Sequence, residues 1–260
     1  RLDGVTGVQT CALPIFSCVL GTLTGPILKG TLASTLGKPG SGWVMSGIFV
    51  GLFGTLLCGV AGRLKEAELQ RGTGDQPFVL GKGLLLCGIA GIFSAFYGIA
   101  VNDAGAPIAK TAADFGAGHW QTNIVYIFSN TGAFVTTAAY CIYLARSQKT
   151  FGEFHRPKDA AAGALSVNYL MALLTGCMWY GQFLFYGIAH VRMGQFKFSS
   201  WAIHMLMLIL FSSLAGIAMR EWHGRSRRTR GAMILALLIV GAAVLALTYG
   251  NYLGEHGTGQ

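Results

Sequence analysis

Long apolar segments recur along this sequence, and they limit what the chain can fold into. Six of them are each long enough to cross the hydrocarbon core of a bilayer, about 30 Å thick, as a helix rising about 1.5 Å per residue. They are Trp43 to Gly62, Gly83 to Asn102, Gln121 to Ala145, Leu165 to Ala189, Trp201 to Met219 and Ala232 to Leu253. Only 11% of the residues are charged, against roughly 25% in soluble domains. We therefore predict an all-α fold, a polytopic transmembrane helix bundle.

The amino-terminal residues need separate treatment. Gly7 to Ile15 (GVQTCALPI) resembles translated adapter sequence, so residues 1–15 are interpreted as a sequencing artefact and left out of the fold. The apolar stretch from Phe16 to Leu28 that follows is shorter than the roughly 20 residues that a spanning helix needs. We interpret it as the second half of a helix, which gives about seven helices in all.

Basic residues are distributed unevenly between the apolar segments. The segments 63–82, 146–158 and 220–230 hold 13 of the Lys and Arg residues, and the loops on the opposite side hold five, which are Lys29, Lys38, Lys110, Arg192 and Lys197. Basic loops stay on the cytoplasmic side of a membrane, so we predict that these three loops are cytoplasmic and that the carboxy terminus is outside. The formal net charge of +9 is thereby explained by topology. We expect no nucleic-acid partner, because no basic stripe with interleaved aromatic residues is present.

One apolar segment carries a polar and aromatic face. Trp179, Gln182, Phe183, Tyr186 and His190 follow the spacing i, i+3, i+4, i+7 and i+11, which places them on one side of a helix. Aromatic rings can cover the C–H face of a sugar, while amide and imidazole groups hydrogen-bond its hydroxyls. The alternative is an aromatic belt or polar contacts between helices. Gln182 is the hardest to explain in that way, since an unpaired amide in hydrocarbon costs several kcal/mol.

The segment Gln121 to Ala145 carries a second polar face. Its members are Asn123, Tyr126, Asn130 and Thr137. Asn130 lies near the middle of the segment, where a polar side chain is most costly in lipid. We therefore predict that Asn130 is the substrate ligand of this face.

Two further segments add candidate groups. Trp201 and His204 lie one turn apart on one helix face, and Asn102 and Asp103 lie at the end of another apolar segment. Imidazole titrates between pH 5 and 8, so either His204 or His190 could carry a proton. The alternatives are a neutral histidine bonded to a neighbouring helix, and helix capping by Asn102 and Asp103.

Motifs of enzymes and cofactor proteins are absent from the sequence. It has no nucleophile motif, no phosphate-binding loop and no clustered pair of carboxylates within the apolar segments. Its six cysteines have neither metal-ligand nor redox spacing. We therefore predict that the protein is not an enzyme and binds neither a metal nor a cofactor.

Two stretches carry a resemblance to a known family. GIFSAFYGIAVNDAGAPIAK (residues 91–110) and MWYGQFLFYGIAHVRMGQFKFSSWAIHMLMLILFSSLAGIAMREW (178–222) resemble the L-rhamnose/proton symporter family of the drug/metabolite transporter superfamily. The resemblance implies ten helices in two five-helix repeats of inverted topology, with the substrate site between the repeats near the midplane. On this pattern, residues 16–62 end the first repeat, 63–82 form a cytoplasmic loop, 83–253 form the second repeat and 254–260 form an external tail.

The function implied by this resemblance is secondary active transport. We expect proton-coupled uptake of L-rhamnose or a related 6-deoxyhexose across the bacterial inner membrane, with sugar, proton and lipid as partners. The expected substrate-binding residues are Asn102, Asn130, Gln182, His190 and His204, with Trp179, Tyr186 and Trp201 stacking on the sugar ring. The candidates for proton coupling are His190, His204 and Asp103. The alternatives are a drug/metabolite-type exporter, an uptake carrier for another small neutral metabolite, a membrane scaffold, and a membrane enzyme with its active residues elsewhere.

Overall fold

A computed structural model describes residue 24 and residues 26–27, 30–73, 80–155 and 164–256, and these residues contain helices and no strands. The predicted all-α class is therefore confirmed. Residues 1–15 and most of the stretch from Phe16 to Leu28 lie outside the described residues. The chain forms two compact units, one made of residues 1–103 and 193–260 and the other of residues 104–192.

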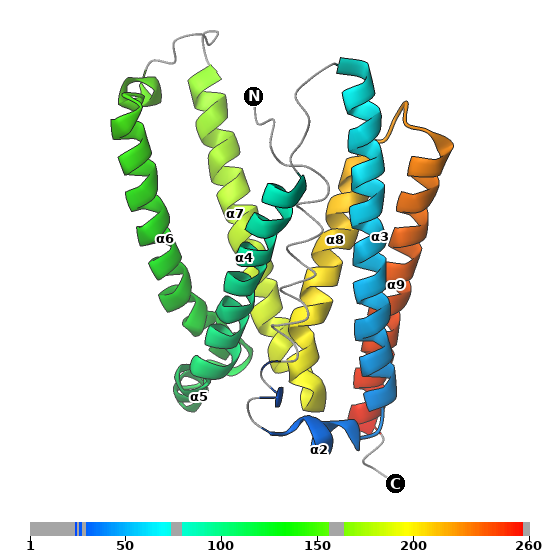
Figure 1. The fold of residues 1–260 in the computed structure, drawn as a ribbon. Coiled ribbons are helices and arrows are strands. Elements are labelled where there is room, and N and C mark those ends of the chain that lie inside the picture. Colours follow the sequence, from blue (N-terminus) through cyan, green and yellow to red (C-terminus); the bar gives the residue numbers. More distant parts are fainter. Residues whose placement is uncertain (1–23, 25, 28–29, 74–79, 156–163, 257–260) are drawn as a thin grey trace. The chain divides into compact units, whose positions relative to one another are not determined.

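The first unit contains the longest helices (Figure 1). Its elements are α2 (Leu32–Leu36), α3 (Ser41–Thr73), α4 (Leu80–Ile99), most of the π-helical η1 (Ala100–Ala104), the 3-10 helix η4 (Gly194–Ser199), α8 (Ser200–Ala218) and α9 (Arg227–His256). Helices α3 and α9 run antiparallel and side by side. Their apolar side chains and those of α8 form the core, in which Val44, Ile48, Leu206, Val240 and Leu247 are at most 1% exposed.

Close approach of α3 and α9 depends on glycine. A Cβ atom on Gly250 would lie 2.8 Å from the backbone nitrogen of Val44 and 2.9 Å from the carbonyl oxygen of Gly40. Gly47 faces Leu247 in the same way, since its Cβ would lie 2.8 Å from Leu247 Cγ. Small residues allow membrane helices to pack backbone against backbone. The glycine-rich sequence of α3 thus determines how closely this helix pair packs.

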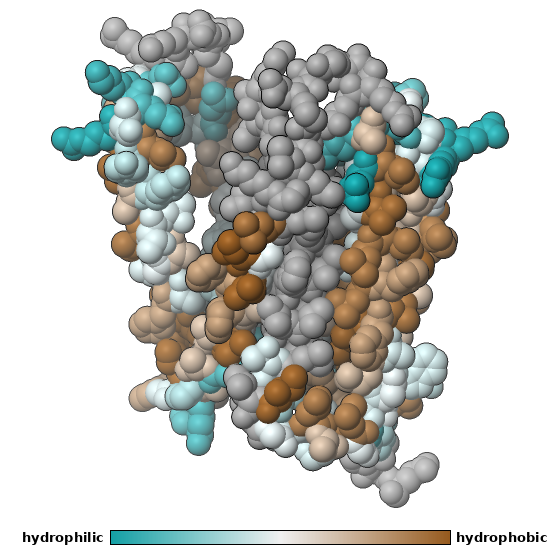
Figure 2. Space-filling view, viewed as in Figure 1, coloured by the Kyte–Doolittle hydropathy of each residue, from teal (hydrophilic) through white to brown (hydrophobic). Residues whose placement is uncertain are grey.

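The turn between α8 and α9 contacts the carboxy-terminal part of α3. Lys65 Nζ lies 3.2 Å from Glu221 Oε2 and 4.8 Å from the centroid of the Trp222 ring. The basic segments that follow Gly62 and Met219 therefore lie at the same end of this helix pair. Figure 2 shows apolar side chains along the middle of α3 and α9 and hydrophilic ones gathered at that end.

The second unit is a smaller helical assembly. It contains α5 (Ala106–Asp114), η2 (Gly118–Trp120), α6 (Gln121–Ser147), η3 (Phe151–Phe154) and α7 (Ala164–Val191). Helices α6 and α7 meet where α6 begins and α7 ends (Figure 1). Toward their other ends they expose large apolar side chains, including Phe134 and Met178. The contact between these two helices is therefore local.

The six predicted segments all correspond to observed helices, and two of their ends differ clearly, because α9 begins at Arg227 rather than at Ala232 and α3 extends beyond Gly62. Helix α3 continues past Gly62 to Thr73, through residues expected to be loop. This continuation contains Leu64, Lys65, Glu66, Ala67 and Glu68, which are among the strongest helix formers. Local propensity thus extends the helix beyond its apolar part.

Four helical stretches among the described residues are long and apolar enough to cross a membrane. They are Ser41–Leu69, Gly88–Asp114, Phe196–Ala218 and Arg227–His256. Helices α6 and α7 are present but fall outside this set, because their polar residues, such as Asn130 on α6 and Gln182 on α7, lower the mean hydropathy. The predictions of about seven helices in this chain and of ten in two inverted repeats stay predictions.

Candidate functional site

The contact between α6 and α7 brings together one buried aromatic ring and several polar groups. Tyr126 of α6 is fully buried, and its ring centroid lies 5.4 Å from that of Phe183 and 6.5 Å from that of Tyr186 on α7. The Tyr186 ring lies 5.7 Å from the imidazole of His190. We call Asn123, Tyr126, Tyr186, Gly187 and His190 the α6–α7 polar cluster. Two neighbouring helices thus turn their polar faces toward each other.

Asn123 has the most constrained position in the α6–α7 polar cluster. Its side chain is packed against Gly187, where a Cβ atom would lie 2.5 Å from Asn123 Oδ1 and 3.3 Å from Tyr126 Cε2. Asn123 is 8% exposed, and within the described residues neither atom of its amide has a hydrogen-bond partner. The absence of a side chain at Gly187 lets the two helices approach here, and it places a buried amide against the neighbouring backbone.

The rings of the predicted α7 face form two contacting pairs. The Trp179 and Phe183 centroids lie 5.1 Å apart, and the Tyr186 and His190 centroids lie 5.7 Å apart. Tyr186 is buried, whereas Trp179 is 50% exposed and His190 is half-buried. Gln182 is half-buried beside them. The rings that the spacing placed together therefore do lie along one side of α7, and their role in substrate binding stays a prediction.

Asn130 occupies a less enclosed position than Asn123. It lies about two turns further along α6 and is half-buried. Sequence reasoning placed both amides on one face and chose Asn130 as the ligand. In the structure Asn123 is the more buried of the two. Its burial depends on contact with Gly187 of α7, and the sequence alone does not show that these two residues meet.

The first unit holds the other candidate residues. Trp201 is 2% exposed and packs on Gly98, whose Cβ would lie 3.1 Å from two atoms of the indole. The Tyr97 ring lies 6.4 Å away on the same helix, α4, and the His204 ring lies 5.6 Å from Trp201 on α8. The predicted pairing of Trp201 and His204 is therefore present, with α4 covering the indole.

Asn102 and Asp103 lie within η1, the π-helical turn between α4 and α5. Both side chains are half-buried. A π-helical turn inside an otherwise α-helical stretch is rare and often occurs at functional sites. These two residues thus belong to a widened turn that links two helices.

The candidate residues therefore form two groups. Asn130, Trp179, Gln182, Tyr186 and His190 belong to the second unit, and Asn102, Asp103, Trp201 and His204 belong to the first. The groups present in each unit supply hydrogen bonds, ring faces and imidazoles. Among the described residues, no three His, Cys, Asp or Glu side chains come together in a way that could hold a metal ion.

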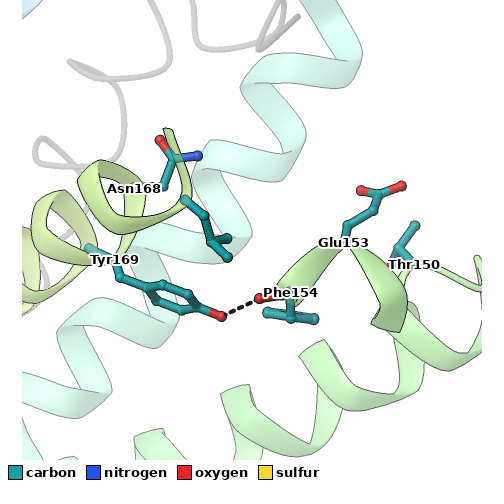
Figure 3. A pocket seen from close by; sticks show the side chains of 7 residues that line it. Thr150, Glu153, Phe154, Asn168 and Tyr169 are labelled. Carbon is teal, nitrogen blue, oxygen red and sulfur yellow. Dashed lines mark hydrogen bonds between the residues drawn. The ribbon is translucent and has the colours of Figure 1, made fainter. Parts of the chain in front are cut away.

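Two hollows in the second unit are lined by other residues. One of about 330 Å³ lies between η3 and the start of α7 and is lined by Thr150, Glu153, Phe154, Leu165, Asn168, Tyr169 and Ala172. In it the Tyr169 hydroxyl donates a 2.8 Å hydrogen bond to the Phe154 carbonyl (Figure 3). The other, of about 580 Å³, lies between α5 and α6 and is lined mainly by apolar side chains. Glu153 and Asn168, which line the first hollow, are exposed to solvent. A ligand bound in that hollow would displace water but would not bury either side chain.

Comparison with known proteins gives a consistent result. A family model described as "L-rhamnose-proton symport protein (RhaT)" matches residues 4–252. The chain is 31% identical over 224 residues to the L-rhamnose-proton symporter of Yersinia pestis (strain Pestoides F) and 32% identical over 225 residues to that of Salmonella paratyphi A. Each alignment covers 85% of this chain and 64% of the relative, so the chain spans less than two thirds of these relatives. No solved structure matches it.

Proposed function

Because this chain belongs to the L-rhamnose-proton symport protein family, we propose that it acts in proton-coupled uptake of L-rhamnose or a related 6-deoxyhexose across the bacterial inner membrane. Two similar proteins are themselves named L-rhamnose-proton symporters. Four helices long and apolar enough to span a bilayer support a membrane location. The drug/metabolite-type exporter gains no support from the comparisons.

The observation that carries the proposal is the α6–α7 polar cluster. Buried Asn123, Tyr126 and Tyr186 lie on two helices that are each long enough to cross a bilayer. Amides and phenols within a membrane bundle are costly unless they bond to one another or to a ligand. A neutral molecule rich in hydroxyl groups matches them, because each hydroxyl both donates and accepts.

The individual side chains would divide the work according to their exposure. Trp179 has half of its surface exposed and is the best placed of the three predicted rings to receive a sugar. Tyr186 and Trp201 are already covered by protein, so they would contact the sugar only after rearrangement of their neighbours. Asn102, Asn130, Gln182, His190 and His204 remain the proposed hydroxyl-binding residues.

Proton coupling is proposed to use an imidazole or a carboxylate near these rings. His190 lies against Tyr186, and His204 lies against Trp201. A proton taken up at either ring would change the local charge beside the proposed sugar-binding residues of the same unit. Asp103, in the π-helical turn, is the third candidate.

The proposed topology follows from the basic segments. In the first unit the basic residues after Gly62 and those after Met219 share one end of the helix pair, where Lys65 meets Glu221. Such an end is expected on the cytoplasmic side, which would put the carboxy terminus outside. We further propose that residues 16–62 end one repeat and 83–253 form the inverted second one.

The test is uptake of labelled L-rhamnose by cells that lack their own rhamnose carrier and express the full-length gene product. Uptake should exceed that of the empty vector, should fall when the proton gradient is collapsed, and should be accompanied by alkalinisation of a weakly buffered medium. Unlabelled 6-deoxyhexoses should compete, and anionic sugars should not. Absence of rhamnose uptake by a protein that is inserted in the membrane would reject the proposal.

A further inference from the structure

The buried amide of Asn123 is the polar group that its surroundings explain least. Its Oδ1 and Nδ2 are both buried, and no hydrogen-bonding group in the described part of the chain pairs with either of them. Most buried polar side-chain atoms in proteins have a partner. A leucine of similar size would suit a purely structural role between two helices far better.

The surroundings of Asn123 fix where the amide lies. On one side it contacts the backbone of α7 at Gly187, and on the other it is followed by fully buried Tyr126, one turn along α6. The Tyr126 ring is itself held between Phe183 and Tyr186. An amide held in this way loses little conformational freedom when it binds a ligand, so its hydrogen bonds are preorganised.

The chemistry of the site favours a neutral ligand. The other side chains of the α6–α7 polar cluster are two phenols and the imidazole of His190, and His190 is the only one of them that ordinarily titrates near neutral pH. An amide presents a carbonyl acceptor and two N–H donors, a pattern that matches a hydroxyl group acting as donor and acceptor at once. A carboxylate ligand would find an opposite charge in this cluster only at a protonated His190, and an ammonium ligand would find none.

From this geometry we infer that Asn123 is a specificity-determining residue that binds one hydroxyl group of a neutral sugar once the side chains that cover it move aside, with Gly187 keeping the amide in place. The inference rests on the proposed function and deepens it, because it assigns a contact to a residue that spacing alone did not select. Gly187 is part of the arrangement because any side chain there would displace the amide.

The experiment measures sugar binding and thermal stability of the purified full-length gene product. The variants are Asn123→Ala and Asn123→Ser, and Thr136→Ala, at an exposed position on the same helix but outside its polar face, serves as the matched control. Binding is measured for L-rhamnose and for its analogues that each lack one hydroxyl group. Thermal melting without ligand reports on any structural role of the amide.

We expect Asn123→Ala to bind L-rhamnose about 5- to 150-fold more weakly, as for the loss of one partner of a buried hydrogen bond. Its melting temperature should equal or exceed that of the parent, since an unpaired buried amide is removed. Asn123→Ser, which keeps a donor and an acceptor, should recover part of the affinity. One analogue lacks the hydroxyl group that Asn123 binds. The parent should bind this analogue about as weakly as Asn123→Ala binds L-rhamnose, and Asn123→Ala should bind the analogue no more weakly than it binds L-rhamnose.

Other results would overturn the inference. One is an affinity for L-rhamnose that is unchanged in Asn123→Ala. Another is an Asn123→Ala protein that binds L-rhamnose and every analogue more weakly by the same factor and also melts at a lower temperature. A third is failure of Asn123→Ala to fold, and each of the three results makes the amide structural. If the parent binds another neutral sugar but not L-rhamnose, the proposed substrate is wrong, and the comparison is made with that sugar and its analogues. A parent that binds no neutral sugar contradicts the role of Asn123 as well.

Discussion

The carboxylate of Glu68, near the end of α3, accepts a 3.0 Å hydrogen bond from the backbone N–H of Ser226, the residue that precedes α9. The hydroxyls of Ser226 and Thr229 donate to the same carboxylate. The Ser226 hydroxyl oxygen in turn accepts the N–H of Thr229, at 3.2 Å. This arrangement resembles a capping box in which the acidic residue comes from another helix. It satisfies backbone donors that the first turn of α9 would otherwise leave unpaired.

Replacing Glu68 with alanine should therefore lower the melting temperature of the protein. The change leaves the Ser226 N–H and the Thr229 hydroxyl without their acceptor and removes a negative charge from the positive end of a helix. Glu153→Ala, at an exposed position in the second unit, is the control and should melt like the parent. Equal melting of the two variants would show that Glu68 does not stabilise the start of α9.

The other end of the same helix pair gives a prediction about packing. Gly250→Ala should destabilise the protein by about 1 to 3 kcal/mol, the usual cost of overpacking, because the new Cβ would lie 2.8 Å from the Val44 nitrogen. Gly241→Ala is the matched control on α9, since nothing lies within 4 Å of its Cβ position. It should be neutral or, through helix propensity, stabilising by up to about 1 kcal/mol. Thermal melting checks both, and a neutral Gly250→Ala would contradict the close approach.

Membrane orientation can be tested with reporters. A reporter enzyme that is active only outside the cytoplasm should be active when fused after α9. A reporter that is active only in the cytoplasm should be active when inserted at Lys149, between α6 and η3. The physical reason is the excess of Lys and Arg in the segments 63–82, 146–158 and 220–230. Labelling of a cysteine placed at Arg225 by a membrane-impermeant reagent added to intact cells would contradict this orientation.

The helices were largely predictable from the sequence because their signal is local. Apolar runs gave α8 and α9 to within a few residues of their ends. The continuation of α3 to Thr73 was missed because an apolar pattern stops at the membrane surface while helix propensity does not. Propensity and hydropathy are separate signals, and only the second was used to set the end of this helix.

The contacts between helices were not predictable in the same way. Glu68 and Ser226 are 158 positions apart, and their pairing depends on how α3 and α9 are rotated against each other. The choice of Asn130 over Asn123 failed to anticipate burial for the same reason. Periodicity shows which residues share a face, but it does not show which of them meets a glycine on the neighbouring helix.

Gln182→Leu tests whether the α7 face binds substrate. Leucine keeps the helix and suits an apolar environment, so loss of a mere interhelical hydrogen bond should change affinity by about 0.6 kcal/mol, a few-fold at most. A substrate ligand should cost about 1 to 3 kcal/mol, or roughly 5- to 150-fold in affinity, with the protein still inserted. We expect the larger effect in L-rhamnose binding by the full-length gene product. A loss below about threefold would make Gln182 structural.

The proton carrier can be identified by comparing His190→Phe with His204→Phe in the same full-length protein. An imidazole can change charge between pH 5 and 8, whereas phenylalanine keeps a ring of similar size without a titratable group. His190 contacts Tyr186 of the α6–α7 polar cluster, so we expect His190→Phe to remove the pH dependence of uptake over this range. It should also uncouple sugar entry from proton entry while sugar binding persists. His204, whose ring lies against buried Trp201, is the matched control, and its replacement should leave the pH profile in place. The opposite pattern would assign coupling to His204. Parent-like profiles in both variants would make the His190 ring a structural neighbour of Tyr186 and would leave Asp103 as the remaining candidate within this chain, beside any group elsewhere in the full-length protein.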